Sequence, residues 1–289
     1  MAALVASGAY AQRVHVPLSP VLRPGLITLP HLGATSHARL IGLGTLTSAP
    51  DTPLTPLAGL SAFHIGYQGG DHMFRRSQLL LEGALVRAAF TDRNDDDYWA
   101  IDATWINFTG GQSGSVSGRG GGRQPLHLAI PAGPPNSTFV LRGFSFERDP
   151  GTDANLKQMA IGLEPSGDSI EVMLSDNEGA DFRLGQRGAR NLGRDGRQYD
   201  VTVQYAWIPN SLVASSGIVT GSVGNREAAS IPAGAALISG FSFQFLNGDH
   251  HIWKIDVDTA NGGMGQFQDN NTDDPMHWQI NYVSLKPPA

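Results

Sequence analysis

Short stretches in which apolar and polar residues alternate, separated by turns rich in glycine and proline, recur along the whole chain. In GFSFQF, for instance, Phe241, Phe243 and Phe245 occupy every second position. A period of two places such side chains on one face of a half-buried strand. The sequence has no long stretch of helical periodicity. It therefore predicts an all-β fold of short antiparallel strands, arranged as tandem β-sandwich modules behind an extended N-terminal arm.

The strand pattern is repeated. LSAFHIGYQGGDHMFRRS (60–77) aligns without a gap with ISGFSFQFLNGDHHIWKI (238–255), and FTDRNDDDYWAIDATWINF (90–108) aligns with FQDNNTDDPMHWQINYVSL (267–285). A more diverged copy begins at LRGFSFERDP, from residue 141. Each copy predicts a strand, a polar turn, a strand, an acidic loop and a strand. Three separate modules or three sub-sheets of one structure would both give this pattern.

The repeats set the expected domain boundaries. A Pro/Gly-rich arm, with HARLIGLGTL as a possible strand, leads into the first repeat. Gly/Ser-rich segments separate the repeats, and we expect flexible or extended connectors there. The predicted order is arm 1–56, first repeat 57–109, connector 110–123, second repeat 124–209, connector 210–230 and third repeat 231–289.

Composition and charge exclude several classes of function. A net charge of −6 offers no basic surface for nucleic acid. Without cysteine the chain has neither disulfides nor thiolate metal sites. The opening MAALVASGAYAQR lacks the basic start of a secretory signal peptide, so none is expected. No stretch approaches the roughly 18 consecutive apolar residues of a membrane span.

Two pairs of strands resemble a known family. VLRGFSF with YDVTVQYAWI, and ALISGFSF with HWQINYVSL, resemble the H-type lectin domain, a small antiparallel β-sandwich. The resemblance implies trimers that bind N-acetylgalactosamine-type sugars at subunit junctions, and modules of this kind occur on phage-tail-like particles. The Gly-Asp-His triplets of the first and third repeats lie outside this likeness.

The polar turn of each repeat carries an aspartate. In a hairpin turn such a side chain accepts hydrogen bonds from the backbone amides that follow it. We favour this turn role over a metal role. For the neighbouring histidines a turn or interface role is favoured, because the adjacent His250 and His251 would point to opposite faces of a strand. The three turn residues are Asp71, Asp153 and Asp249.

The acidic loops DRNDDD and DNNTDD are candidate calcium sites. They place oxygen ligands one or two residues apart, as a hard cation requires, although the spacing is not that of an EF-hand. Ordinary loop composition is the competing interpretation, and no other cofactor is expected. The candidate ligands are Asp92, Asn94, Asp96, Asp269, Asn271 and Asp273.

Aromatic residues beside these loops are candidate sugar contacts, because a ring can stack on the apolar face of a pyranose. They are Tyr98, Trp99, His277 and Trp278. For the two tryptophans, a place in the core or in a subunit interface is the favoured interpretation. A large aromatic in the last strand of each repeat, Trp105, Trp207 and Tyr282, is expected to fill the core.

No catalytic motif accompanies these features, and repetition favours binding or assembly over a unique active site. We expect a non-catalytic structural or binding subunit of a phage tail or phage-tail-like contractile particle, located in an extracellular particle or virion. Its expected partners are copies of itself in a homotrimer, other particle subunits and cell-surface glycan. The alternatives are a free soluble glycan-binding lectin and a glycan hydrolase.

Overall fold

A computed structural model shows eighteen strands and one short 3-10 helix among the residues that it describes, and the predicted all-β antiparallel fold is confirmed. The described residues are 32–55, 57–70, 72–94, 96–121, 124–149, 155–176, 184, 198–224, 227–228, 230–232, 234–246, 250–259, 263–269 and 275–287. The elements are β1 (Leu32–Gly42), β2 (Thr45–Ser48), β3 (Ala58–Tyr67), β4 (Arg76–Glu82), β5 (Leu85–Thr91), β6 (Trp99–Phe108), β7 (Gln112–Gly121), β8 (Leu126–Ala129), β9 (Ser137–Arg148), β10 (Gln158–Leu163), β11 (Ser169–Ser175), β12 (Gln198–Pro209), η1 (Asn210–Leu212), β13 (Val213–Val223), β14 (Glu227–Ala228), β15 (Ala236–Phe245), β16 (Lys254–Asp258), β17 (Met264–Gln268) and β18 (Pro275–Leu285).

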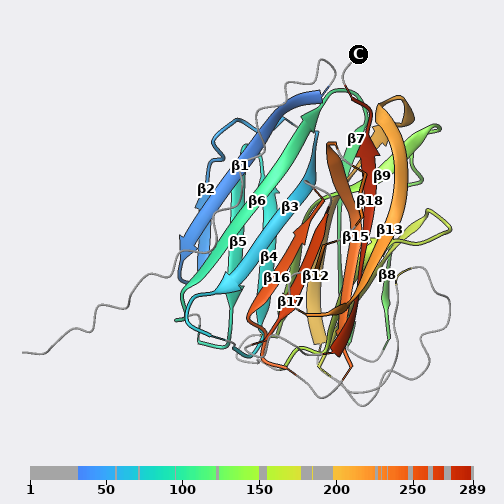
Figure 1. Ribbon diagram of the computed structural model, residues 1–289. Coiled ribbons are helices and arrows are strands. Elements are labelled where there is room, and N and C mark those ends of the chain that lie inside the picture. The colour runs from blue at the N-terminus through green and yellow to red at the C-terminus, as the bar shows by residue number, and fades with distance from the viewer. Residues whose placement is uncertain are drawn as a thin grey trace, which may run out of the picture.

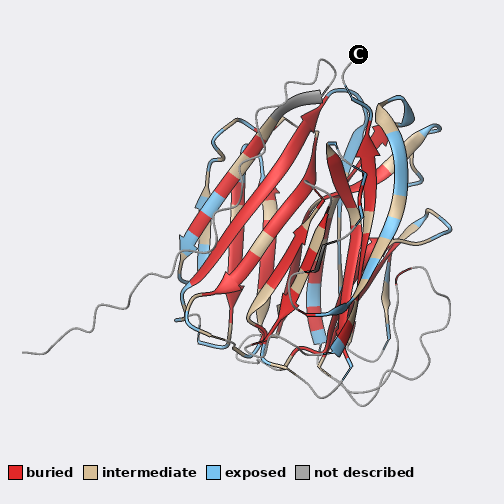
Figure 2. Ribbon diagram, in the orientation of Figure 1, coloured by how far each residue is buried: buried red, intermediate tan, exposed pale blue. Residues whose placement is uncertain are grey.

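The strands form three six-stranded sheets around a shared core (Figure 1). Sheet 1 has the order β1-β6-β3-β16-β17-β14, sheet 2 has β2-β5-β4-β9-β12-β7, and sheet 3 has β13-β18-β15-β10-β11-β8. The central strands β3 and β6 are buried almost throughout, whereas the edge strands β7 and β13 are largely exposed (Figure 2).

Each sheet is built from two repeats. The first repeat contains β1–β6, the second β7–β12 and the third β13–β18. Every repeat keeps its first, third and sixth strands in one sheet and places its second, fourth and fifth strands in the next, so that sheet 1 joins the first and third repeats, sheet 2 the second and first, and sheet 3 the third and second. The repeats are therefore interlocked sub-sheets of one structure, the possibility that the sequence had left open beside separate modules.

The edges of neighbouring sheets meet at the corners of this arrangement. The edge strand β1 of sheet 1 lies beside the edge strand β2 of sheet 2, and β7 lies beside β8 at the next corner. At the third corner the amide of Phe267 donates to the carbonyl of Gly224, at 3.0 Å, where the chain leaves β13. Exposed sheet edges are sites of unwanted pairing, and here the edge strands β1, β2, β7 and β8 each lie close to another edge of the same chain.

Three equivalent phenylalanines form the centre of the core. The ring centroids of Phe63, Phe144 and Phe241 lie 5.2 to 5.4 Å apart in edge or tilted packing. They come from β3, β9 and β15, the same strand of each repeat and one strand of each sheet. The alternation read from the sequence therefore places the same side chain of each repeat at one central point.

A second apolar cluster lies beyond a β-bulge that interrupts each of these strands. The pairing register shifts between Leu60 and Ala62, and at equivalent points of β12 with β9 and of β15 with β18. Past a bulge the strand twists more strongly, so side chains near its start can leave the first core. The second cluster contains Ile106, Phe108, Val140, Ala206, Ile208, Leu237, Val283 and Leu285.

The prediction that 110–123 and 210–230 are connectors is wrong. Most of each segment is the first strand of a repeat, β7 or β13. Glycine is needed there because tyrosines of the neighbouring strand lie over it. A Cβ on Gly114 would stand 2.5 Å from the hydroxyl of Tyr205, and one on Gly217 would stand 2.6 Å from that of Tyr282. Where aromatic rings cover an edge strand, the strand needs glycine, and its composition then resembles that of a flexible linker.

Two other boundaries change. The predicted arm 1–56 contains β1 and β2, which belong to the first repeat, and residues 1–31 lie outside the described part. In the last strand of each repeat the equivalent aromatics are Trp105, Tyr205 and Tyr282, which face the same position of the neighbouring strand. Trp207, expected to be one of the three, lies two residues beyond the equivalent position.

Candidate functional site

The described strand ends that flank the turns of the repeats lie at one end of the structure. At this end β3, β9 and β15 finish and β4, β10 and β16 begin, as the pairing of Gly66 with Lys254 and of Glu147 with Arg76 shows. The acidic loop of the first repeat is brought to the same place, because Gln68 donates its amide to the carbonyl of Tyr98 at 2.7 Å. We call this the loop end.

One cluster of side chains that could hold a metal ion is present at the loop end among the described residues. It consists of His72 from the turn after β3, and Asp92 and Asp97 from the loop after β5. Nδ1 of His72 lies 2.9 Å from Oδ2 of Asp97 and 4.0 Å from Oδ2 of Asp92. One donor atom from each residue lies within 4.8 Å of the others. The three side chains are 15 to 30% exposed, so the cluster is accessible from solvent.

Both sides of the cluster are held in place. His72 donates its amide to the carbonyl of Ile252 at 3.0 Å and accepts the amide of Ile252 at 2.9 Å, which attaches the turn of the first repeat to the third. Its imidazole packs on the ring of Tyr67, with centroids 4.5 Å apart. Oδ1 of Asp92 accepts the amide of Asn94 at 2.9 Å, which leaves Oδ2 directed toward His72.

The surroundings of Asp97 change its protonation. The pKa of Asp97 is raised by partial burial first and then by a hydrogen bond to Asp92, while the charge of His72 acts in the opposite direction. Two carboxyl groups that share a site disfavour double ionisation. A positive charge between them, either an imidazolium or a metal ion, relieves that repulsion.

The third repeat has a related pair. Nδ1 of His250 lies 2.7 Å from Oδ2 of Asp269, and its imidazole stacks on Phe245 with centroids 4.1 Å apart. His250 and Asp269 align with His72 and Asp92, and Phe245 aligns with Tyr67. The sequence thus places the same histidine and carboxylate at equivalent points of two repeats.

The second repeat differs at this point. Arg148 follows Phe144 and Phe146 as Tyr67 follows Phe63 and Ile65, so an arginine occupies the position of the aromatic ring. Its side chain is 1% exposed. The loop end therefore carries related but unequal chemistry in its three repeats.

The predicted calcium ligands are only partly brought together. Asp92 belongs to the cluster, and Asp269 contacts His250. Asn94 and Asp96 are exposed and are not members of the cluster. Asn271 and Asp273 lie outside the described residues, as do the turn aspartates Asp71, Asp153 and Asp249.

The predicted sugar contacts divide in the same way. Trp99 and Trp278 are 0% and 2% exposed, and their indole N–H groups donate to the carbonyls of Gly44 and Val223. A buried ring offers no face to a sugar. Of the two places that the sequence favoured for these tryptophans, the core and a subunit interface, both rings occupy the core. His277 is half-buried, and Tyr98, next to Asp97 in the chain, is 54% exposed.

The outer face of sheet 1 carries a row of polar residues that the sequence pattern did not predict. Neighbouring strands place Arg39, Asp102, His64, Asp256 and Gln266 opposite one another. Nδ1 of His64 lies 3.7 Å from Oδ2 of Asp256. Burial lowers the pKa of His64, but the nearby carboxylates of Asp256, Asp258 and Asp102 outweigh burial and raise it above its usual value.

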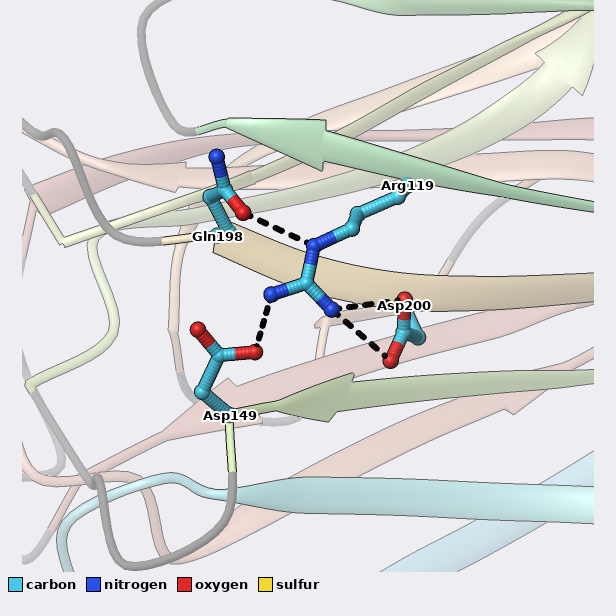
Figure 3. Close-up of polar contacts among 4 residues, drawn as sticks. All are labelled: Arg119, Asp149, Gln198 and Asp200. Carbon is cyan, nitrogen blue, oxygen red and sulfur yellow. Dashed lines mark hydrogen bonds and ion pairs between the residues drawn. The ribbon is translucent and has the colours of Figure 1, made fainter.

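On sheet 2, a surface arginine joins three neighbours around the edge strand β7 (Figure 3). Nε of Arg119 donates to the side chain of Gln198 at 2.8 Å, and the guanidinium also contacts Asp200, at 3.2 Å, and Asp149. All of these contacts are exposed, so each contributes little to stability. The contacts link Arg119 of β7 to two residues of β12 and to Asp149, which follows β9.

Comparisons with known proteins add no family. No protein-family model matches the chain, and a search of curated proteins gives no significant match. No helix in the described part of the chain has the length and apolar character needed to cross a membrane. The fold and the site define an all-β protein of three interlocked repeats with a cluster of one histidine and two aspartates at the loop end.

Proposed function

We propose that the protein is a non-catalytic binding or assembly subunit in which three repeats of one chain take the places of three subunits. The observation that carries the proposal is the cyclic exchange of strands among the repeats, with Phe63, Phe144 and Phe241 at the centre. The H-type lectin resemblance implies a trimer, and one chain of three interlocked repeats supplies the same threefold arrangement without a second molecule.

The loop end is the proposed contact surface. Of the eight exposed large apolar side chains among the described residues, six lie at this end: Ile41, Leu43, Met73, Tyr98, Val223 and Leu246. Apolar groups that gather on one part of a surface are typical of binding sites. They come from the first and third repeats, an arrangement that suits attachment at more than one point.

The biological setting in this proposal is a phage tail or phage-tail-like particle, where the loop end would contact another particle subunit or a cell-surface glycan. The support for this setting is the H-type lectin resemblance. The free soluble lectin is the alternative, and it differs in requiring glycan binding by the isolated protein.

Two measurements test the proposal. Light scattering coupled to size-exclusion chromatography should give the mass of one chain, because the threefold arrangement is complete within it. A stable trimer in dilute solution would overturn the replacement of subunits by repeats.

A glycan array, read with and without a chelator, separates recognition from assembly. If the binding of a sugar is lost in Tyr98→Ala but kept in Leu85→Ala, the loop end is the recognition surface.

A further inference from the structure

We propose that His72, Asp92 and Asp97 form a binding site for a divalent transition-metal ion of the zinc type. The inference goes beyond the proposed function and does not depend on it. It rests on a cluster of one imidazole and two carboxylates whose members come from two separate segments of the first repeat. The sequence had instead grouped Asp92 with Asn94 and Asp96 as calcium ligands.

The ligand types favour a transition metal over calcium. Calcium takes six to eight oxygen ligands, whereas zinc and its neighbours bind imidazole nitrogen and carboxylate oxygen in small numbers. Three protein ligands with one position left open to solvent is an arrangement found in zinc sites. The partial exposure of the three side chains, 15 to 30%, leaves room for that fourth ligand.

The spacing also fits. Ligands about 2 Å from a tetrahedral ion lie roughly 3.3 Å from one another. The distances from Nδ1 of His72, 2.9 Å to Asp97 and 4.0 Å to Asp92, lie on either side of that value. All three donor atoms lie within 4.8 Å of one another, so one ion could be shared among them after the side chains adjust.

The surroundings orient the ligands. The amide of Asn94 holds Oδ1 of Asp92, and the ring of Tyr67 supports the imidazole of His72. Such second contacts fix ligand geometry in metal sites. A related histidine-aspartate pair recurs in the third repeat, where His250 lies 2.7 Å from Asp269.

Isothermal titration of the chelator-treated full-length protein with zinc chloride tests the proposal, with cobalt(II) absorption as a second readout. His72→Ala and Asp97→Asn should each weaken zinc binding at the first-repeat site at least tenfold. His127→Ala is the matched control, because His127 also contacts a carboxylate, Glu164, but lies outside the cluster. It should bind zinc as the original protein does.

His250→Ala separates the two repeats, since it should leave the site at His72 intact. Asp92→Asn, which preserves the shape of the side chain, serves as a second ligand variant if His72→Ala disturbs folding. The proposal is overturned if the original protein binds no zinc, if both cluster variants bind it unchanged, or if calcium binds with a comparable affinity at the same residues. Glycan binding and chain mass are measured separately, so failure of the metal site leaves the proposed function unaffected.

Discussion

The ring of Phe63 packs edge-on against the ring of Phe144, with centroids 5.2 Å apart, although the two residues belong to different repeats and different sheets. Phe241 completes the contact from the third. All three phenylalanines are 0% exposed. The central contact therefore exists only when all three repeats are folded together.

Removing one of these rings should destabilise the entire protein. Truncation of a buried phenylalanine costs about 3 to 5 kcal/mol through lost burial and the cavity that remains. We expect Phe144→Ala to lower the free energy of unfolding by about that amount, measured by denaturant titration. Leu85→Ala, at a side chain that is 42% exposed, is the control and should change little. A small effect of Phe144→Ala would show that the core collapses around the missing ring.

A single repeat should not fold alone. In a chain of residues 32–108, β4 would lack its partner β9, and β3 would lack β16. We expect circular dichroism of this fragment to show no cooperative thermal transition, whereas the full chain unfolds in one transition. A fragment that melts cooperatively as a monomer would contradict the need for strand exchange.

Glycine on the edge strand β7 should be required wherever a tyrosine covers it. In Gly114→Val the new side chain would meet the ring of Tyr205. Overpacking of this kind costs roughly 1 to 3 kcal/mol. Ser115→Val tests the neighbouring exposed position, where valine suits a strand and no such loss is expected. Equal stability of the two variants would refute the steric explanation.

The polar row on sheet 1 should make stability depend on pH through His64. Because its folded pKa is raised above the usual 6.5, its stabilising contribution is complete below that value and is lost as the pH rises through the folded pKa. We predict that the stability difference between the original protein and His64→Ser decreases over that range. Serine occupies the equivalent positions 145 and 242.

Asp256→Asn provides the control for this pH effect. It removes the carboxylate 3.7 Å from His64 and should reduce the pH dependence. Denaturant titrations at a series of pH values measure both variants. A stability difference that stays constant, or increases as the pH rises, would contradict the raised pKa.

Much of the fold could be predicted from the chain because the apolar alternation is local. The alignment of 60–77 with 238–255 makes Phe63 and Phe241 equivalent positions of the repeat, and the structure brings their two rings together. The glycine-rich edge strands could not be recognised, because their reason lies in Tyr205 and Tyr282 on neighbouring strands. The sequence likewise contains no local signal that the strands of one repeat are divided between two sheets, each formed with another repeat.

The candidate site shows the same division. Spacing within the acidic loop selected Asp92, Asn94 and Asp96, since neighbouring oxygen ligands are all that a linear pattern can display. Asp97 belongs to the site instead, because the turn that carries His72 lies closest to it. Recurrence of a histidine and an aspartate in the first and third repeats was the signal that could have connected the two segments.

The sequence by itself determined that the protein is all-β, that it contains three repeats and which residues form the core face of the central strands. Those features follow from side-chain period and self-similarity, which are properties of neighbours along the chain. Only the tertiary structure decided that the repeats exchange strands, that Gly/Ser-rich segments are strands, and that His72 meets Asp92 and Asp97. These depend on which distant strands pair and where loops meet, and pairing between distant segments is decided by packing in three dimensions.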